Sequence, residues 1–411
     1  MSDSQSIAFL GRWEGFQVGA VQRRERSPDQ PREEVWIELI EVKGEAMRCS
    51  GCGRPLDRVY DIEQRWVRDL PLLDAETWLR LPRRRVDCPR CGPKVEHLPW
   101  LAPYSRVTRR LADSVARLCR DVPVRQVAAY FHLDWKTVKR IDKEHLQERL
   151  GPIDLAGVTV LLMDEFAIQK GHRYATTIVD PYTKRVLWVG RGRSRESLRP
   201  FFALLGREGR RAIRAVVMDM NGAYEEEVRA QCPQAEVIYD LFHVVAKYSR
   251  EVIVRVRGDE ANRLRSGKAA CQVIKSSHWL LLRNKENISR PQDRVRLREL
   301  LAANRALFTV YLLKDELKHL WDFRYPKAAL RFWKHWYGWA VRSRIEPLRR
   351  FAHRLKPYLP GIIAHCRWRL HTSLLEGINN TIKVIKRRAY GFHDDDYFFL
   401  KIRAAFPGIG R

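Results

Sequence analysis

The sequence predicts a multidomain α/β protein, and three observations carry this prediction. Two Cys-x-x-Cys pairs stand near the N-terminus, at Cys49–Cys52 and Cys88–Cys91. A basic pattern of two short helices follows between residues 101 and 150. Beyond it, short apolar runs alternate with helical segments, and two of the runs end on aspartates, Asp164 and Asp219. Buried strands that alternate with helices are typical of an α/β core with parallel strands.

The composition limits the classes of protein that fit. A chain of 411 residues is long enough for two or three domains. Its 77 Lys and Arg residues against 49 Asp and Glu give a net charge of +28, spread along the chain, so we expect a nucleic-acid partner. No apolar stretch is long enough to cross a membrane, and the N-terminus lacks a signal-peptide pattern. We therefore expect a cytoplasmic protein whose cysteines bind metal or stay free.

Residues 1–100 are predicted to form a zinc-binding domain that resembles a zinc ribbon. The segment Val35–Val42 alternates like a strand. Two residues between paired cysteines let both sulfurs reach one ion, and the glycine after each pair allows a tight turn. Four thiolates would fill a tetrahedral structural zinc site: Cys49, Cys52, Cys88 and Cys91. The gap between the pairs is longer than in a compact ribbon and contains two strand-like segments. Unliganded thiols are the alternative.

Residues 101–150 are predicted to form a helix-turn-helix. Val127, Ala128 and Phe131 would pack the first helix, and His132–Asp134 would form the turn. The second helix, Trp135–Lys143, would face inward through Val138 and Ile141, and would present polar side chains to a DNA major groove: Lys136, Thr137, Lys139 and Arg140. The alternative is a helical hairpin within a larger bundle, but the excess of basic residues favours DNA binding.

Residues 151–255 are predicted to form the first part of an RNase H-like core. The apolar run Val158–Met163 indicates a strand buried on both faces, which would end at Asp164. The order of elements that follows is β-β-α-β-α-β-α, with strands at Tyr174–Val179, Arg185–Val189, Ala215–Asp219 and Ala235–Tyr239, and helices at Arg195–Leu205 and Leu241–Arg255. The RNase H-like fold has this order, with its fourth strand parallel to and beside the first. Asp180 fits a hairpin turn better than a ligand position.

Asp164 and Asp219 would then lie at neighbouring strand ends. With two divalent ions about 3.5–4 Å apart, paired carboxylates form a site for in-line phosphoryl transfer. Magnesium or manganese suits such oxygen ligands. Glu165 would point to the opposite face of the strand, so we do not expect it to bind the metal. Taken alone, Asp164 is better explained as the point where a strand emerges into solvent, and the metal interpretation depends on the other carboxylates.

The remaining residues are predicted to be mainly helical. Residues 256–365 are basic and rich in Trp, and Trp333, Trp336 and Trp339 share one helical face, which predicts either an aromatic core or stacking on unpaired bases. In residues 366–411 an apolar stripe lies beside a polar face that carries Glu376 and Lys383. Glu376 would complete the metal site, and an amphipathic helix with an exposed Glu is the alternative.

Three segments resemble the DDE transposases of bacterial insertion sequences, and among them the ISL3 group. They read L-L-M-D-E-F, V-V-M-D-M-N and L-L-E-G-I-N-N-T-I-K-V-I-K-R-R-A-Y-G-F. The resemblance extends from Cys49 to Phe406. It implies that Asp164, Asp219 and Glu376 are a catalytic triad for two Mg²⁺ or Mn²⁺ ions. It also implies that residues 256–365 are a helical insertion in the core, and that residues 366–411 contain the last helix of the core.

The resemblance further implies an activity and its partners. The expected reaction is metal-dependent cleavage at terminal inverted repeats of double-stranded DNA, followed by strand transfer into target DNA. The expected enzyme is a homodimer or larger assembly on DNA in the bacterial nucleoid. His243 would orient the scissile phosphate, unless it is a satisfied core histidine. The DNA backbone would be contacted by Lys383, Lys386, Arg387 and Arg388.

One part of the family pattern is missing, and two other functions stay open. Some related transposases carry Tyr and Arg before the catalytic Glu, where this chain has Arg369 and Thr372. One alternative function is a sequence-specific DNA-binding regulator with a silent core. Another is a structure-selective nuclease on the same fold, which would cut without joining.

Overall fold

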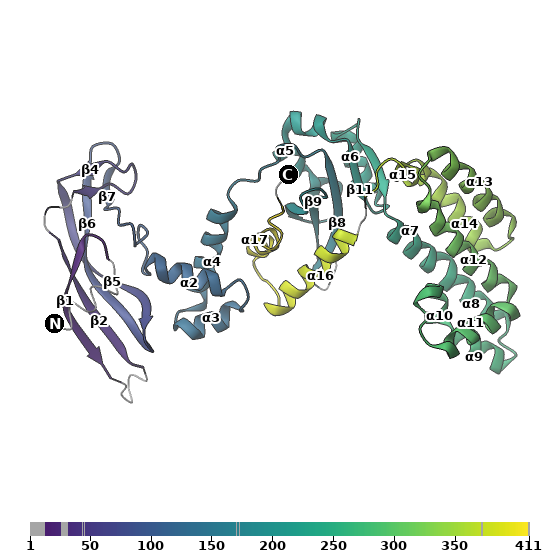
Figure 1. Cartoon of the computed structure of the whole chain (residues 1–411), viewed down its shortest axis with the longest axis horizontal. Helices are drawn as coiled ribbons and strands as arrows, with labels where there is room; N and C mark the ends of the chain where they lie inside the picture. The colour runs from purple at the N-terminus through teal and green to yellow at the C-terminus, as the bar shows by residue number, and fades with distance from the viewer. Residues whose placement is uncertain are drawn as a thin grey trace. The chain divides into compact units, whose positions relative to one another are not determined.

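The computed structural model describes residues 13–25, 32–42, 44, 46–169, 171, 173–370 and 373–409. These residues fall into two compact units (Figure 1). The first unit comprises Met1–Gly151 with Arg387–Gly391, and the second comprises Pro152–Lys386 with Phe392–Arg411. Thr372, one of the two departures from the family pattern, lies outside the described residues.

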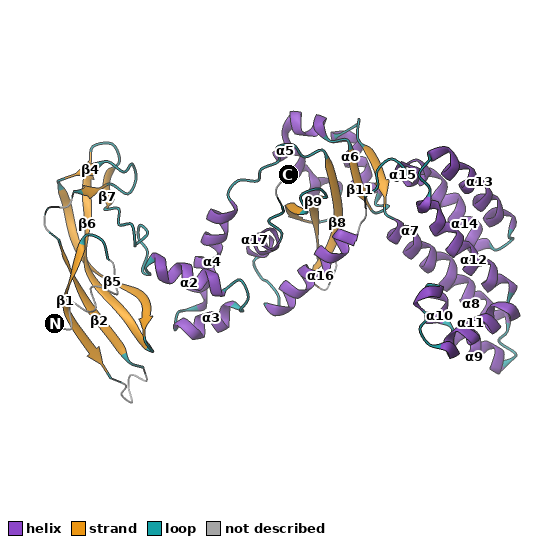
Figure 2. Ribbon diagram, in the orientation of Figure 1, coloured by secondary structure: helices purple, strands orange, loops and turns teal. Residues whose placement is uncertain are grey.

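The first unit begins with a sheet of five strands, shown in orange in Figure 2. The order along the sheet is β1-β2-β6-β5, and β7 pairs with β6. The bounds are β1 (Phe16–Arg24), β2 (Glu34–Glu41), β5 (Val59–Leu72), β6 (Ala75–Cys88) and β7 (Gly92–Val95), and a two-stranded ribbon lies beside them, β3 (Met47–Arg48) with β4 (Pro55–Leu56). Alternate apolar residues of the central strands are buried on one face, including Ile37, Leu39, Leu79 and Leu81. The strand predicted at Val35–Val42 is β2.

The long gap between the two cysteine pairs is explained by the hairpin β5–β6. These two strands of 14 residues each pair antiparallel, so the chain leaves the first cysteine pair and returns beside it. The segment is longer than a compact ribbon because it also forms half of the sheet.

Helices α2 (Arg109–Leu118), α3 (Val124–Phe131) and α4 (Trp135–Leu150) follow the sheet. The side chains predicted to pack the helix-turn-helix are all buried: Val127, Ala128, Phe131, Val138 and Ile141. Helix α3 ends because His132 adopts a left-handed conformation with φ of 53°. The Asp134 carboxylate then caps α4 by accepting from the backbone N–H groups of Lys136 and Thr137. The second helix was predicted too short, since it continues beyond Lys143 to Leu150.

A buried aspartate joins the sheet to the helices within the first unit. The side chain of Asp69 on β5 is fully buried. Its carboxylate accepts hydrogen bonds from Trp13 Nε1 at 2.9 Å, Thr108 Oγ1 at 2.6 Å and Arg110 Nε at 2.6 Å. Because Thr108 also caps α2, this carboxylate ties the first helix to the sheet.

The second unit is built around a mixed sheet of order β10-β9-β8-β11-β12. The strands are β8 (Val160–Gln169), β9 (Arg173–Asp180), β10 (Arg185–Arg191), β11 (Ala215–Met218) and β12 (Glu236–Tyr239). The first three are antiparallel, and β11 runs parallel to β8 and beside it, as the order of elements predicts. Asp180 is a turn residue as expected, since its carboxylate accepts from Tyr182 N and Thr183 Oγ1.

One prediction for this sheet is wrong. Strand β8 does not end at Asp164, because its ladder with β9 continues through Asp164↔Thr177 and on to Gln169. The apolar run stops at Met163, but the backbone hydrogen bonds do not depend on side-chain polarity. Asp164 therefore projects from the interior of a strand.

Helices cover both faces of this sheet, and alternate residues of β8 point to different faces. Leu161 and Met163 pack in the cluster that contains residues of α5 (Arg195–Ala212) and α6 (Gly222–Gln231). Val160 and Leu162 pack in the cluster that contains residues of α16 (Ser373–Arg388) and α17 (Asp395–Ala405). By the same alternation Asp164 faces α16, whereas Glu165 faces the opposite side. The strand is buried on both faces, as predicted.

From Leu241 to Ala364 the described residues form helices, drawn in purple in Figure 2, and short connections, drawn in teal. The α-helices are α7 (Leu241–Tyr248), α8 (Val254–Arg263), α9 (Lys268–Ser276), α10 (His278–Leu282), α11 (Pro291–Ala303), α12 (Arg305–His319), α13 (Pro326–Arg342), α14 (Glu346–Leu355) and α15 (Leu359–Ala364). Trp333 and Trp336 are buried and stacked at 5.3 Å, and Trp336 Nε1 donates to Leu313 O, so these two side chains form a core. Trp339 is exposed.

Within these helices a buried lysine closes the end of α10. Lys314 Nζ donates to the carbonyl oxygens of Leu281 at 2.9 Å, Leu282 at 3.4 Å and Arg283 at 3.1 Å. These carbonyls have no helical partner at the C-terminus of α10, so the ammonium group caps the helix. Burial lowers the pKa of Lys314 to about 8.

We expect Lys314→Met to lower the free energy of unfolding by about 1–3 kcal/mol, because buried carbonyls lose their donor. The pH dependence should change too. Because the folded pKa of Lys314 lies below the ordinary lysine value, the unfolded chain binds more protons between about pH 8 and 10.5, and the parent gains stability as pH rises through that window. Urea unfolding at pH 7 and pH 9.5 measures both effects. The exposed Lys334 supplies the control: an equal loss in Lys334→Met would contradict the capping role.

Candidate metal centres

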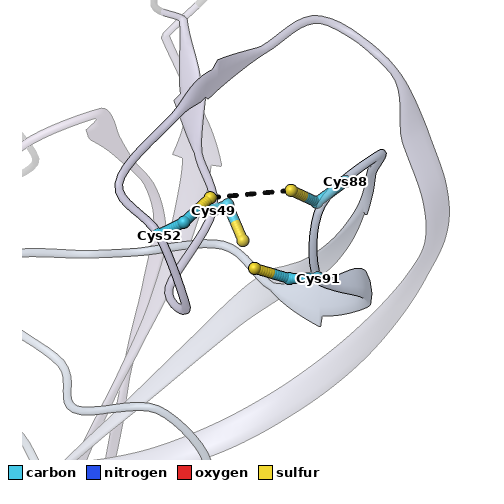
Figure 3. Close-up of side chains that lie close together, drawn as sticks. All are labelled: Cys49, Cys52, Cys88 and Cys91. Carbon is cyan, nitrogen blue, oxygen red and sulfur yellow. Dashed lines mark hydrogen bonds between the residues drawn. The ribbon is translucent and has the colours of Figure 1, made fainter.

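The four predicted zinc ligands come together at one end of the first sheet (Figure 3). The sulfur atoms of Cys49, Cys52, Cys88 and Cys91 all lie within 4.8 Å of one another. Tetrahedral zinc with Zn–S bonds of about 2.3 Å needs sulfurs about 3.8 Å apart. The Sγ atoms of Cys52 and Cys88 are 3.6 Å apart, so the geometry fits zinc.

Each cysteine pair sits on a tight turn that its glycine permits. Gly53 N donates to Cys49 O at 2.8 Å, and Gly53 and Gly92 have φ of 73° and 67°. Burial raises the pKa of the Cys88 thiol, but hydrogen bonds from the backbone of Arg90 and Cys91 and from the other cysteines together lower it, and the net pKa lies below the usual thiol value. The pKa of Cys91 is raised instead, by its hydrogen bond with Cys52 and by burial. A thiolate is the form that binds zinc.

Asp164 lies on the α16 face of β8 and is buried. Its Oδ1 accepts from the Glu165 backbone N–H at 2.8 Å, and its Oδ2 accepts from Asn379 Nδ2 at 2.6 Å. Asn379 was not predicted from the sequence. The available signal was its position three residues after Glu376, on the same side of the helix.

Asp219 follows β11 directly, next to Asp164 across the sheet. Val217 pairs with Leu162 in the parallel ladder, so Asp164, two residues further along β8, lies beside Asp219 at the edge where β11 ends. Burial raises the pKa of both carboxyl groups, and the charge of Asp219 adds to the rise at Asp164. A buried carboxylate beside a half-buried one, each with a raised pKa, could hold a cation.

His243 lies between two carboxylates at this edge. Its Nδ1 is 3.8 Å from Asp219 Oδ2, and its Nε2 is 3.8 Å from Asp240 Oδ2. Asp240 follows β12 and caps α7, which carries His243 one turn later. The His243 side chain is 34% exposed, so it is not enclosed in the core.

Glu376 lies on α16, one turn before Asn379, and is exposed. The burial of Leu375, Ile378 and Ile382 sets the helix against the sheet. Asp164, Asp219 and Glu376 do not gather as closely as the cysteines: among the described residues, the one His/Cys/Asp/Glu group whose ligand atoms all lie within 4.8 Å is the cysteine cluster.

Basic residues line α16 beyond Glu376. Lys383, Arg387 and Arg388 are exposed, whereas Lys386 is half-buried and its Nζ donates to Ala167 O of β8 at 3.2 Å. On α4, Lys136 and Arg140 are exposed and Thr137 and Lys139 are half-buried, and Arg140 pairs with Glu144 at 2.9 Å. None of the helices in the described part of the chain is long and apolar enough to span a bilayer.

Comparison with known proteins places these features in one group. Residues 161–402 match a transposase model of the ISL3 DDE group, residues 96–146 match the helix-turn-helix domain of transposase family ISL3, and residues 45–91 match the zinc-finger of transposase IS204/IS1001/IS1096/IS1165. The transposase for insertion sequence element IS1001 of Bordetella parapertussis is 51% identical over 412 residues and covers 100% of both chains. The transposase for IS1557 of Mycobacterium tuberculosis is 28% identical over 374 residues, which are 84% of this chain and 82% of that protein.

Proposed function

The chain belongs to the ISL3 family of DDE transposases, and from this premise we propose that it cuts and joins DNA with two divalent ions held by Asp164, Asp219 and Glu376. The observation that supports the proposal is the placement of Asp164 in β8 beside Asp219, which directly follows the adjacent parallel strand β11. The strand order of the second sheet supports an RNase H-like core, and the helices between Leu241 and Ala364 support an insertion in it.

The residues at this edge suit Mg²⁺ or Mn²⁺. Both ions prefer oxygen ligands and leave coordination positions open for substrate phosphate. Asp164 supplies a buried carboxylate and Asp219 a half-buried one, and the Asn379 amide orients the carboxylate of Asp164. Glu376 is exposed on the helix that carries Asn379, so its side chain is free to complete the site when the ions and DNA bind.

Each protein group then has a role in phosphoryl transfer. When bound, the ions would supply Lewis-acid activation of water for cleavage and of the freed 3′-hydroxyl for attack on target DNA. Asp164, Asp219 and Glu376 would hold the ions through their carboxylate oxygens. His243 orients the scissile phosphate from its place beside Asp219.

The two DNA-binding regions select the substrate. The zinc domain and helix-turn-helix bind the terminal inverted repeats, and α4 contacts DNA through Lys136, Thr137, Lys139 and Arg140. The backbone near the cut is contacted by Lys383, Lys386, Arg387 and Arg388. Because two element ends react together, the active form is a homodimer or larger assembly.

A strand-transfer assay tests this function against its alternatives. The protein is incubated with DNA carrying the element's end, target DNA, and Mg²⁺ or Mn²⁺, and cut and joined products are separated on a gel. Transposition requires both products. A structure-selective nuclease yields only cut DNA, and a DNA-binding regulator yields neither.

We expect the double variant Lys136→Ala, Arg140→Ala to bind the element's end about 10- to 100-fold more weakly, because two charged contacts to DNA are lost. The slope of log Kd against log salt should fall as well. Electrophoretic mobility shifts at several salt concentrations measure both. Arg149→Ala is the control, since Arg149 is exposed at the far end of the same helix. Equal weakening in that control would mean that general charge, and not this face of α4, determines binding.

A further inference from the structure

We propose that Arg193 binds a backbone phosphate of the DNA strand that is cut, and that Glu165 positions Arg193 for this contact. This inference rests on the proposed function. It assigns roles to two residues that the metal site does not use.

The loop that carries Arg193 is fixed on both sides. Arg193 follows Gly192, which has φ of 93°, and precedes Ser194, the N-cap of α5. Gly192 N donates to Tyr174 O at 2.8 Å, and Thr176 Oγ1 donates to Gly192 O at 2.8 Å. The loop is therefore bonded to β9, the neighbour of the strand that carries Asp164.

The Arg193 side chain is held by two groups. Its Nη1 donates to Glu165 Oε1 at 3.1 Å, and its guanidinium carbon lies 4.0 Å from the ring centroid of Tyr174. Glu165 is only 23% exposed, and its Oε2 is buried with no hydrogen-bond partner in the described part of the structure. Within that part, Arg193 is the cation that pairs with this carboxylate.

Stability does not explain this arrangement. Arg193 is 48% exposed, and ion pairs at such positions contribute about 0–1 kcal/mol. The guanidinium has five N–H donors, and the hydrogen bond that it makes in the described residues uses Nη1. The other N–H donors of the guanidinium can therefore bind an anion that approaches from solvent.

The location of the charge indicates which anion. Glu165 adjoins Asp164 on β8, although its side chain points to the other face of the sheet. The loop of Arg193 is bonded to Tyr174 and Thr176 of β9, beside Thr177, which pairs with Asp164, so the guanidinium lies next to the metal-binding edge. The carboxylates of Asp164, Glu165 and Asp219 repel the phosphates that DNA must bring to this edge. The Arg193 guanidinium, held by Glu165, offers charge-assisted hydrogen bonds to a phosphate, and these do not depend on the base sequence.

Removing single phosphate charges tests the contact directly. A series of element-end DNAs is made, each with one neutral methylphosphonate near the cut, and single-turnover cleavage by saturating protein is measured. We expect Arg193→Gln to cut unmodified DNA about 10- to 100-fold more slowly, with Kd for the end within about twofold of the parent. At one or two positions, the methylphosphonate should slow the parent but not the variant.

Three further variants complete the test. Arg199→Gln removes an exposed arginine of α5 with similar ion pairs and should cut like the parent. Arg193→Lys should cut faster than Arg193→Gln but more slowly than the parent, because lysine restores the positive charge but not the planar set of guanidinium donors. Glu165→Gln should slow cleavage and weaken the same phosphate coupling. The inference would be overturned if each methylphosphonate slowed the Arg193→Gln variant by the same factor as it slows the parent. It would also be overturned by an Arg193→Gln cleavage rate within twofold of the parent rate. Cleavage that survives Asp164→Asn would instead overturn the proposed function.

Discussion

Asp164→Asn is expected to reduce metal-dependent cleavage of the element's end by about 10³-fold or more, because an amide cannot replace the carboxylate that holds the ions. Binding to the same DNA should be unchanged, since α4 and the zinc domain remain intact. Single-turnover cleavage with Mg²⁺ and with Mn²⁺, next to a binding titration, measures the two quantities separately.

Stability measurements distinguish this loss from unfolding. Burial raises the pKa of Asp164 above the ordinary aspartate value. The stabilising effect of such a group is present at low pH and is lost as pH rises through the folded pKa, so the ionised carboxylate destabilises the metal-free protein at pH 7. The amide that replaces it can still accept from Asn379. We therefore expect Asp164→Asn to be at least as stable as the parent at pH 7 without metal, by thermal melting.

Matched variants make the result specific. Asp219→Asn should lose cleavage to a similar extent. Asp259→Asn should retain it, because Asp259 is an exposed residue of α8 that pairs with Arg255. If Asp164→Asn cuts as fast as the parent, the two-metal mechanism at this edge is wrong.

Cys88→Ser is expected to remove about one zinc ion per chain and to unfold the end of the first sheet. The apolar cluster there is small, with Met47, Val86 and the cysteines at its centre, so the metal must supply much of the local stability. Elemental analysis measures the zinc, and thermal melting should show the first unit unfolding at lower temperature. Binding to the element's end should fall with it.

The chain contains a suitable control for the zinc prediction. Cys271 is buried in α9 of the second unit and is not one of the four clustered thiols, so the Cys271→Ser protein should keep its zinc. Chelation of the parent should reproduce the melting change of Cys88→Ser. Full zinc content in Cys88→Ser would show that the four thiols do not form the site.

Features that depend on neighbouring residues were predictable from the sequence. The turn at His132–Asp134 is one example, because apolar periodicity and the capping aspartate both act within a few residues. The candidate zinc ligands are another, since Cys-x-x-Cys spacing alone lets two sulfurs reach one ion. The buried strand at Val160–Met163 also followed from its apolar run.

The parts that were missed depend on strand pairing and on distant contacts. The apolar run placed the end of β8 at Asp164, whereas pairing with β9 carries the strand to Gln169. Asn379 is 215 residues from the carboxylate that it contacts, and Arg193 is 28 residues from Glu165. No local pattern marks such pairs.

The sequence by itself determined which elements form and which residues could bind metal or DNA, because periodicity, capping and ligand type act over short stretches. Only the tertiary structure decided which of those residues meet. The β5–β6 hairpin brings the two cysteine pairs together, and the Val217↔Leu162 register sets Asp219 beside Asp164. The packing of α16 against the sheet places Asn379 within hydrogen-bond distance of Asp164. These meetings depend on the register and burial of whole elements, which arise only when the chain packs.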